Sequence, residues 1–415
     1  MKRSVLFLFI FSCTIIFASN PVYEQCSGVW AKEILSSLTL QEKIGQLFIV
    51  AAASCFEQQE EALATAMFKS PYTMDPDYIK KLITQYHIGG LIFLYKSTPD
   101  KQIDAINEYQ ALSKVPLLIS QDCEWGLSMR LYNTTVYPRN DLLGMLADKS
   151  LIYDLGREIA RQCRAVGVHM NFAPVVDINN NPNNKVIGSR SFGGDAYQVA
   201  DAALLMMQGL QDERVLACAK HFPGHGDTSI DSHFDLPIVL HDMKRLEELE
   251  MIPFKHLIDH GVASVMSAHL AIPKLEKDAQ RASSLSYTIV TDLLEHELQF
   301  SGLKVTDALG MGAITKNYAP GQAELEAFLA GNDILLCPLD VPQAIDLVEQ
   351  AICDGKITEE ELDRRVLKIL KAKEWSGAAR FEFIDKERVL EALYSSSALS
   401  LQKMLETAVS LSTGA

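Results

Sequence analysis

Asp231 and His233 are separated by one residue and could form an acid/base pair. In an extended segment, side chains at positions i and i+2 point the same way, so the carboxylate can contact the imidazole. That contact would fix the tautomer of the ring and make it a better proton acceptor, and histidine titrates near neutral pH. The alternative is a surface pair that merely adjoins in sequence, and the spacing alone favours that alternative.

Asp307 is the second candidate for chemistry. It follows a β-rich run and precedes the small and apolar residues Ala308 and Leu309, which does not suit a solvated surface charge. In a site that cleaves sugars, such a carboxylate can attack the anomeric carbon and form a covalent intermediate. Alternatively, Asp307 pairs with Lys220 or Arg190 and only holds the loops together.

The segment 220–233 contains His221, His225 and His233, a number of histidines that could suggest a metal site. The segment has no H-x-H or H-E-x-x-H spacing, however, and Lys220 would place a cation beside the metal. Two glycines let its backbone turn sharply. We therefore expect a loop over the mouth of a barrel, and no bound metal.

The composition is that of a soluble globular protein, with 48% hydrophobic and 22% charged residues. The net charge of -15 argues against a nucleic-acid partner, because phosphate binding needs clustered Lys and Arg. A length of 415 residues is too great for one small domain, but one α/β barrel with extensions could absorb most of it.

Short apolar, β-rich runs recur along the chain and predict eight strands. They are Ile44–Val50, Ile88–Leu94, Pro116–Asp122, Val168–Asp177, Val215–Phe222, Ala263–Leu270, Leu303–Leu309 and Asp333–Pro338. Between them lie stretches with apolar residues at three- and four-residue spacing, which predict helices. The clearest are Leu151–Val166, Ala196–Gln211, Met243–His260 and Tyr287–Leu298.

Alternation of strands and helices argues for a parallel sheet, and eight such units fit a closed (β/α)₈ barrel. A doubly wound sheet is the rival, but its usual Gly-rich phosphate loop is missing from Val50–Ser54. In a barrel the active site lies at the C-terminal ends of the strands. Polar residues gather there, namely Asp122, Glu124, Asp177, Arg190, Lys220, His221, His225, Asp231, His233, His269 and Asp307.

Two further helices are predicted after the last strand, over Val341–Asp354 and Ile357–Ala372. Thr358 can cap the second helix, with Glu361 three residues on. The catalytic domain is thus expected over residues 20–375. The tail, residues 376–415, is predicted to be helical and is too short for a domain of its own.

The N-terminus predicts a signal peptide over residues 1–19. Lys2 and Arg3 precede the apolar run Val5–Phe17, after which small residues follow. The run is too short to span a bilayer comfortably, so we expect a secreted or periplasmic protein. A buried first strand or helix is the structural alternative. Cys13 weakly matches a lipoprotein cleavage site, which would add a lipid anchor and association with the cell envelope.

With these segments in view, the chain resembles glycoside hydrolase family 3, and within it the bacterial β-N-acetylglucosaminidase branch. The likeness runs from about Leu35 to Trp375, and its most specific part is Lys220–Gly226 continuing to Asp231-Ser232-His233. The resemblance implies a TIM-like barrel, a retaining mechanism and no metal or organic cofactor. It implies terminal β-linked N-acetylglucosamine as substrate, including units released during peptidoglycan turnover.

The resemblance also assigns roles to residues. Asp307 matches the nucleophile, His233 the acid/base and Asp231 its partner. Sugar-binding positions are matched by Asp122, Arg190, Lys220 and His221, and less securely by Arg130. A neutral imidazole in place of the usual second carboxylate avoids a like charge beside the nucleophile.

The segment Asp122-Cys123-Glu124-Trp125-Gly126 departs from the family's usual Asp-x-Glu-Gly-Gly. Trp125 could stack on a sugar or fill space beside the barrel. Two functions compete with hydrolysis. One is glycosyl transfer to phosphate or to another sugar, and the other is non-catalytic sugar binding at the envelope. Binding alone does not require Asp307, Asp231 and His233 together.

Overall fold

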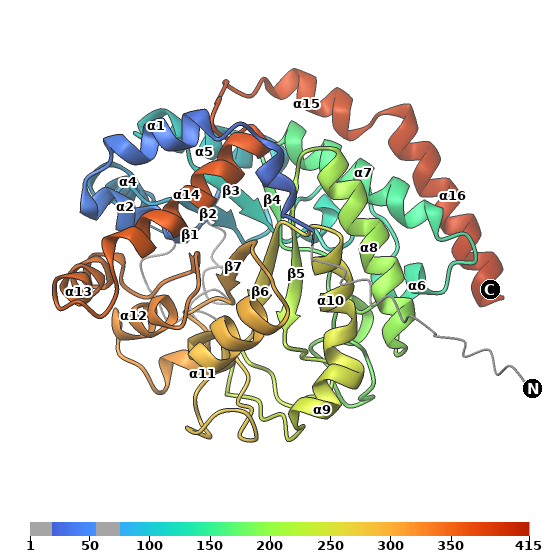
Figure 1. The fold of residues 1–415 in the computed structure, drawn as a ribbon. Coiled ribbons are helices and arrows are strands. Elements are labelled where there is room, and N and C mark those ends of the chain that lie inside the picture. Colours follow the sequence, from blue (N-terminus) through green and yellow to red (C-terminus); the bar gives the residue numbers. More distant parts are fainter. Residues whose placement is uncertain (1–18, 55–74, 415) are drawn as a thin grey trace, which may run out of the picture.

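The computed structural model describes residues 19–54 and 75–414. The predicted signal peptide, apart from Ser19, and the candidate lipidation site Cys13 lie outside the described residues. Eight parallel strands form one sheet (Figure 1). They are β1 (Phe48–Ala52), β2 (Gly90–Phe93), β3 (Leu118–Gln121), β4 (Met170–Asn171), β5 (Leu216–Phe222), β6 (Ser264–Ser267), β7 (Leu303–Thr306) and β8 (Leu335–Leu336).

The sheet closes on itself into a barrel. Its strand order is β7-β6-β5-β4-β3-β2-β1-β8, so neighbours along the chain are neighbours in space. A parallel bridge between Val305 and Ile334 joins the two ends, and the Thr306 N–H donates to the Ile334 carbonyl at 3.0 Å. The predicted (β/α)₈ barrel is confirmed, and its strands are buried along their whole length, as a parallel sheet requires.

The predicted start of the first strand, at Ile44, is wrong. Ile44 lies in the short helix α2 (Leu40–Gly45). Thr39 and Glu42 form a capping box there, in which each side chain bonds the backbone N–H of the other residue. This cap starts a helix inside an apolar run, and the strand begins only at Phe48.

Helices surround the barrel (Figure 1). They are α1 (Val29–Ser37), α4 (Pro76–Gln85), α5 (Pro99–Leu112), α6 (Asn140–Gly144), α7 (Ser150–Ala165), α8 (Ala196–Asp212), α9 (Met243–Arg245), α10 (Met251–Asp259), α11 (Gly312–Thr315), α12 (Gln322–Leu329), α13 (Val341–Cys353) and α14 (Glu359–Ser376). The predicted helix Met243–His260 is divided by a π-helical turn, Leu246–Glu250. The Thr358 cap of α14 is confirmed, because its side chain accepts from the Glu361 N–H.

The C-terminal extension is helical, as predicted. It forms α15 (Lys386–Leu393) and α16 (Ser396–Thr413), both of which pack on α7 at the outside of the barrel (Figure 1). Asn107 anchors the approach to these helices by exchanging two hydrogen bonds with the backbone of Ile384, at 3.0 and 3.1 Å. The extension therefore lies against the barrel wall.

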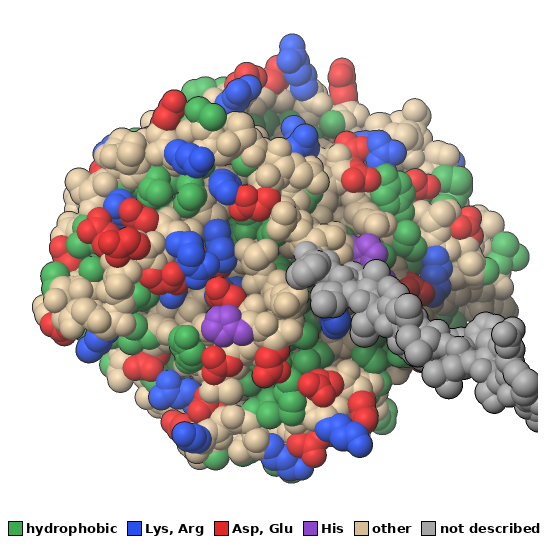
Figure 2. Space-filling view, in the orientation of Figure 1, with side chains coloured by type: hydrophobic (Ala, Val, Ile, Leu, Met, Phe, Trp, Pro, Cys, Tyr) green, Lys and Arg blue, Asp and Glu red, His purple; other side chains and the backbone are tan. Residues whose placement is uncertain are grey.

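Acidic and basic side chains alternate over the face of the molecule shown in Figure 2, and hydrophobic side chains occur there in small groups. Such a mixed surface is usual for a protein in contact with water. Within the described ranges, no helix is both long and apolar enough to cross a bilayer.

Candidate active site

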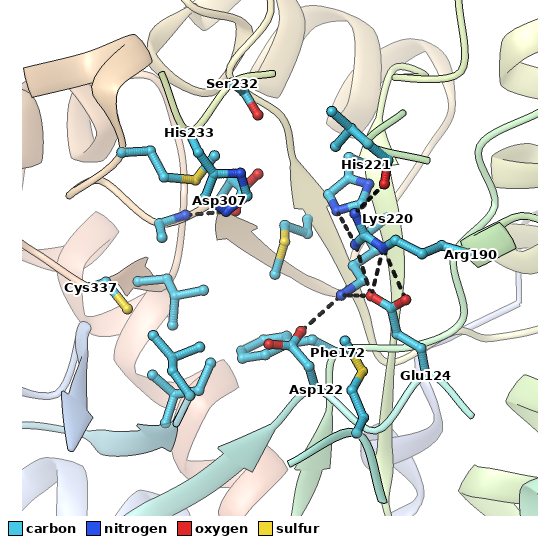
Figure 3. A pocket seen from close by; sticks show the side chains of 18 of the residues that line it. Asp122, Glu124, Phe172, Arg190, Lys220, His221, Ser232, His233, Asp307 and Cys337 are labelled. Carbon is cyan, nitrogen blue, oxygen red and sulfur yellow. Dashed lines mark hydrogen bonds and ion pairs between the residues drawn. The ribbon is translucent and has the colours of Figure 1, made fainter. Parts of the chain in front are cut away.

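A cavity of about 520 Å³ opens at the C-terminal ends of the barrel strands. This volume lies within the usual range of small-molecule sites. Seven of the eight predicted site residues line it, namely Asp122, Arg130, Arg190, Lys220, His221, His233 and Asp307. The eighth, Asp231, contacts His233 from outside the lining. In Figure 3, His233 and Asp307 lie on one side of the cavity. The other side carries Asp122, Glu124, Arg190 and Lys220.

Asp307 directly follows β7 and is held by the backbone on both sides. Its own N–H donates to the Ser267 carbonyl at 2.9 Å, and the Ala308 N–H donates to its Oδ1 at 2.8 Å (Figure 3). Burial alone would raise the pKa of this carboxyl. The neighbouring His269 and His221 and the Ala308 N–H outweigh burial, so the pKa lies below its ordinary value. Asp307 is therefore an anion at neutral pH, as a nucleophile must be.

The predicted Asp231–His233 contact is present. Nδ1 of His233 lies 2.8 Å from Oδ1 of Asp231, and the His233 N–H donates to the same oxygen at 2.9 Å. The loop that carries the pair is tied to the segment after the nucleophile. The N–H of Gly312 donates to the His233 carbonyl at 3.0 Å, and the N–H of Ala313 donates to the Ser232 carbonyl at 3.2 Å. The imidazole is thus oriented by a carboxylate and fixed near Asp307.

Lys220 is buried on the opposite wall between two carboxylates. Its Nζ lies 2.8 Å from Oδ1 of Asp122 and 2.8 Å from Oε1 of Glu124. Within the described residues, neither Lys220 nor Arg190 pairs with Asp307. The alternative that Asp307 only neutralises one of these cations is therefore wrong.

Two arginines complete the charged wall. Arg130 donates from Nη2 to Oδ2 of Asp122 at 2.7 Å. Arg190 donates to both oxygens of Glu124, from Nε at 3.0 Å and from Nη2 at 2.8 Å. Two carboxylates and three cations therefore form one connected network, and Figure 3 shows the part of it made by Asp122, Glu124, Lys220 and Arg190. The two-pronged pair with Glu124 holds the guanidinium group of Arg190 in a fixed orientation.

His221 joins this wall through Asp177. Its Nδ1 lies 2.6 Å from Oδ2 of Asp177, which leaves Nε2 toward the cavity, 3.4 Å from Nη2 of Arg190. Asp177 also accepts the N–H of His225 at 2.6 Å. Burial lowers the pKa of His225 to about 4, so this imidazole is neutral at pH 7. Asp177 therefore holds two of the three predicted histidines of the segment in place.

An irregularity in β5 allows neighbouring residues to face the same cavity. Lys220 and His221 both line it, although successive side chains of a regular strand point to opposite faces. The pairing of β5 with β6 shifts register between Lys220 and Phe222. Such shifts re-aim side chains and are frequent beside active sites.

Glu124 contributes to stability in a pH-dependent way. Burial would raise its pKa, but Arg190 and Lys220 lower it to about 2. The ionised Glu124 therefore stabilises the folded protein. This contribution to the free energy of unfolding is complete above the unfolded-state pKa of about 4.3 and is lost as pH falls towards 2. We expect Glu124→Gln to reduce the free energy of unfolding at pH 7 by on the order of 3 kcal/mol. Urea unfolding between pH 7 and 3 should show a shallower pH slope for the variant, and equal slopes would contradict this prediction.

Trp125 does not line the cavity. The guanidinium carbon of Arg139 lies 4.9 Å from the centroid of the Trp125 ring, a cation–π contact between two residues that do not line the cavity. Of the two interpretations from the sequence, the structure supports space filling beside the barrel. Across the described residues, no group of three or more His, Cys, Asp or Glu side chains is arranged to hold a metal ion.

A family model described as the glycosyl hydrolase family 3 N-terminal domain matches residues 39–372. The chain belongs to this family. This chain is 32% identical to β-hexosaminidase A of Pseudoalteromonas piscicida over 336 residues. The matched segment covers 74% of this chain and 56% of the relative. It is 34% identical to β-hexosaminidase LpqI of Mycobacterium tuberculosis, over a segment that covers 70% of this chain and 77% of that relative.

A solved structure gives the same fold. It is a glycoside hydrolase family 3 β-N-acetylglucosaminidase from Paenibacillus, with a TM-score of 0.78 and 37% identity over 90% of this chain and 69% of that one. The chain spans 56% and 60% of the lengths of the first two curated relatives. The predicted site residues all lie inside the segment that matches the family 3 barrel, residues 39–372.

Four residues in or behind the cavity wall were noted at strand ends, but the sequence assigned them no role. Glu124, Asp177, His225 and His269 end strands or follow them, which was the available signal. Most of their contacts could not be predicted, because the partners are remote in sequence, although the ring of His225 contacts the nearby Thr228 and Ser232. Arg190, for example, bonds Glu124 across 66 residues. Position at a strand end indicates the site, but the choice of partner needs the folded barrel.

Proposed function

We propose that the chain is a retaining exo-β-N-acetylhexosaminidase that hydrolyses terminal β-linked N-acetylglucosamine. The observation that carries this proposal is the presence of an anionic Asp307 and an oriented Asp231–His233 pair at one cavity. Two carboxylates alone would be the usual glycosidase arrangement. The named activities of the similar proteins, β-hexosaminidase and β-N-acetylglucosaminidase, support the N-acetylhexosaminide class.

In the first step, His233 donates a proton from its imidazolium to the glycosidic oxygen. The bond from that oxygen to the anomeric carbon breaks as an oxygen of Asp307 bonds to the same carbon. The aglycone leaves as an alcohol, and a covalent glycosyl-enzyme remains. Because Nδ1 of His233 contacts Asp231, Nε2 is the nitrogen that transfers the proton, and the carboxylate stabilises the imidazolium.

In the second step, the neutral His233 takes a proton from water. The water oxygen bonds to the anomeric carbon, and the bond to Asp307 breaks. Free carboxylate and imidazolium are restored, and the sugar leaves as a hemiacetal. Two successive inversions at one carbon give net retention of the β configuration.

The charged wall opposite Asp307 would bind the hydroxyl groups of the terminal sugar. Asp122 offers acceptors, whereas Arg130, Arg190 and Lys220 offer donors, and His221 presents Nε2. These groups are already paired with one another, so little rearrangement is needed on binding. Their rigid placement supports recognition of one sugar at the end of a glycan.

Arg130→Met removes one donor at the rim of this wall. We expect kcat/KM for a nitrophenyl N-acetylglucosaminide to fall by roughly 10–100-fold, the effect of losing a charge-assisted hydrogen bond. Arg139→Met is the matched control, because Arg139 contacts Trp125 outside the cavity. Steady-state kinetics of both variants test the assignment. Equal kinetic effects in the two variants would show that Arg130 has no specific role in binding.

The proposed activity is tested by release of nitrophenol from the β-N-acetylglucosaminide and from the β-glucoside. We expect cleavage of the first substrate only, with the β-anomer as the first product detected by proton NMR. Cleavage of neither substrate by folded protein, or appearance of the α-anomer first, would contradict the proposal. A phosphate-dependent sugar phosphate product would instead indicate a phosphorylase.

We also propose that the protein is exported and acts on glycans of the cell envelope, including fragments of peptidoglycan. The basic, apolar and small residues at the N-terminus support export. Fusion of residues 1–30 to a reporter that works only after export should give active reporter. A Cys13→Ala fusion that leaves the membrane fraction unchanged would exclude lipid anchoring, and an inactive reporter would contradict export.

A further inference from the structure

His269 is buried directly after β6, beside the segment that carries the nucleophile. Its Nε2 lies 2.9 Å from the carbonyl oxygen of Ala308, and its Nδ1 lies 2.7 Å from Oγ of Ser284. Both nitrogens of the ring therefore have a partner. His269 does not line the cavity, and the proposed reaction does not use it for proton transfer.

These partners determine where the proton of the ring lies. A carbonyl oxygen only accepts hydrogen bonds, so Nε2 of His269 must carry the hydrogen that it donates to Ala308. Burial lowers the pKa of His269, which favours the neutral ring. In that form Nδ1 accepts, and the Ser284 hydroxyl is its donor. The Ala308 carbonyl thus sets the tautomer of the ring, and the Ser284 hydroxyl, which can donate or accept, supports that tautomer by donating to Nδ1.

The turn that carries Ser284 is itself fixed by a buried amide. Nδ2 of Asn332 donates to the Ser284 carbonyl at 2.8 Å, and Oδ1 of Asn332 accepts from the Ser267 hydroxyl at 3.0 Å. The backbone carbonyl of Ser267 in turn accepts the Asp307 N–H at 2.9 Å. Asn332, Ser284 and His269 therefore form a buried frame that runs through the backbone and side chain of Ser284 to the Ala308 carbonyl beside the nucleophile.

The chain after Asp307 is held by backbone contacts and by this frame, and the Met311 N–H donates to the same Ala308 carbonyl as His269, at 3.0 Å. The Leu309 N–H donates to the Leu336 carbonyl at 2.9 Å, across the barrel seam. His269 binds the other end of the same peptide unit, at the Ala308 carbonyl. The Ala308 N–H, one peptide bond earlier, donates to Asp307 Oδ1 at 2.8 Å. The orientation of Ala308 therefore links His269 to the carboxylate.

From this geometry, and on the basis of the proposed function, we infer that His269 is a positioning residue for the nucleophile. In the tautomer that accepts from Ser284 at Nδ1 and donates from Nε2, it fixes the backbone of Ala308 and thereby the direction in which the Asp307 carboxylate points. The effect must fall on the attack step, because a displaced nucleophile lowers the rate of covalent bond formation without changing how the opposite wall binds the sugar.

The test measures attack by Asp307 directly. A fluorinated N-acetylglucosaminyl fluoride destabilises the oxocarbenium-like transition state, and its good leaving group lets the covalent glycosyl-enzyme accumulate. The first-order inactivation constant at saturation reports attack per active molecule and does not depend on how much of the sample is folded. For Ser284→Ala we expect this constant to fall by on the order of 10–100-fold, with little change in the half-saturating concentration.

Ser283→Ala is the matched control. Ser283 is also buried, and its hydroxyl donates to the Ala268 carbonyl at 2.7 Å rather than to His269. We expect it to inactivate within about twofold of the wild-type rate, because Asp307 is unaffected. A second pair separates positioning from packing. His269→Gln keeps a neutral N–H donor and should retain more of the inactivation rate than His269→Leu.

The outcomes distinguish this inference from the proposed function. If the reagent does not label the wild-type protein at Asp307, the proposed function fails. If the wild type is labelled and Ser284→Ala inactivates at the wild-type rate, the inference on His269 is overturned and the function stands. An equal loss in Ser283→Ala and Ser284→Ala would also overturn it, because a general packing defect would then explain both.

Discussion

Replacing Asp307 with alanine should abolish hydrolysis of the nitrophenyl N-acetylglucosaminide, with a loss of roughly 10⁵-fold or more in kcat. Among the described residues that line the cavity, the other carboxylates are Asp122 and Glu124 on the opposite wall, and cations engage both, so neither can supply the covalent intermediate. The fold should persist, since Asp307 forms no ion pair within the described residues and loses mainly the Ala308 N–H contact.

A small anion can separate loss of the nucleophile from loss of the fold. Azide should enter the space left in Asp307→Ala and attack the anomeric carbon once, which gives a glycosyl azide of inverted α configuration. Asp227→Ala is the control, because Asp227 pairs with His241 at 2.8 Å, and neither residue lines the cavity. It should keep near-normal activity. Near-normal turnover by Asp307→Ala would remove Asp307 from the mechanism.

The architecture follows from the sequence because a parallel barrel repeats one local rule. Each buried strand is a short apolar run, and each covering helix has apolar residues at helical spacing. The exceptions are local. At Ile44, the capping box of Thr39 and Glu42 outweighs the apolar pattern. Within Val168–Asp177, Pro174 has no N–H to donate, so the regular pairing of β4 is limited to Met170–Asn171.

The sequence predicts where the candidate site lies but not which of its side chains contact each other. The Asp231–His233 contact is local, so the i, i+2 spacing made it possible, although the spacing alone favoured an incidental surface pair and the family resemblance was needed to prefer the contact. The pairing of Lys220 with Asp122 joins residues 98 positions apart, and only closure of the barrel brings them together. The residues at the strand ends indicate where charged side chains gather. Which carboxylate forms an ion pair with which cation depends on the geometry of neighbouring strands.

The same reasoning applies to groups that support the site without touching the sugar. Asp177 and His269 were recognised as strand-end residues, yet nothing in their own segments indicates that one orients His221 and the other holds Ala308. Their roles come from the partners that the fold supplies. Supporting residues are therefore less visible in sequence than the groups that perform the chemistry.

Replacing His233 with alanine should slow hydrolysis by about 10²–10⁴-fold, the usual contribution of a positioned proton donor. The loss should depend on the leaving group. A nitrophenolate with strongly withdrawing substituents needs little protonation, so its release should be slowed least, whereas a sugar aglycone should be affected most. Asp231→Asn should give a smaller loss of the same kind, because it removes the carboxylate 2.8 Å from Nδ1 but keeps the imidazole.

The measurement is kcat/KM over a series of aryl N-acetylglucosaminides whose leaving groups differ in pKa. The slope of log kcat/KM against leaving-group pKa should be shallow for the wild type and steep for His233→Ala. His241→Ala is the control, because His241 pairs with Asp227 away from the cavity, and its slope should match the wild type. An equal loss of kcat/KM on every leaving group in His233→Ala would exclude His233 as the acid. The contribution of an acid catalyst to the rate must rise as the pKa of the leaving group rises.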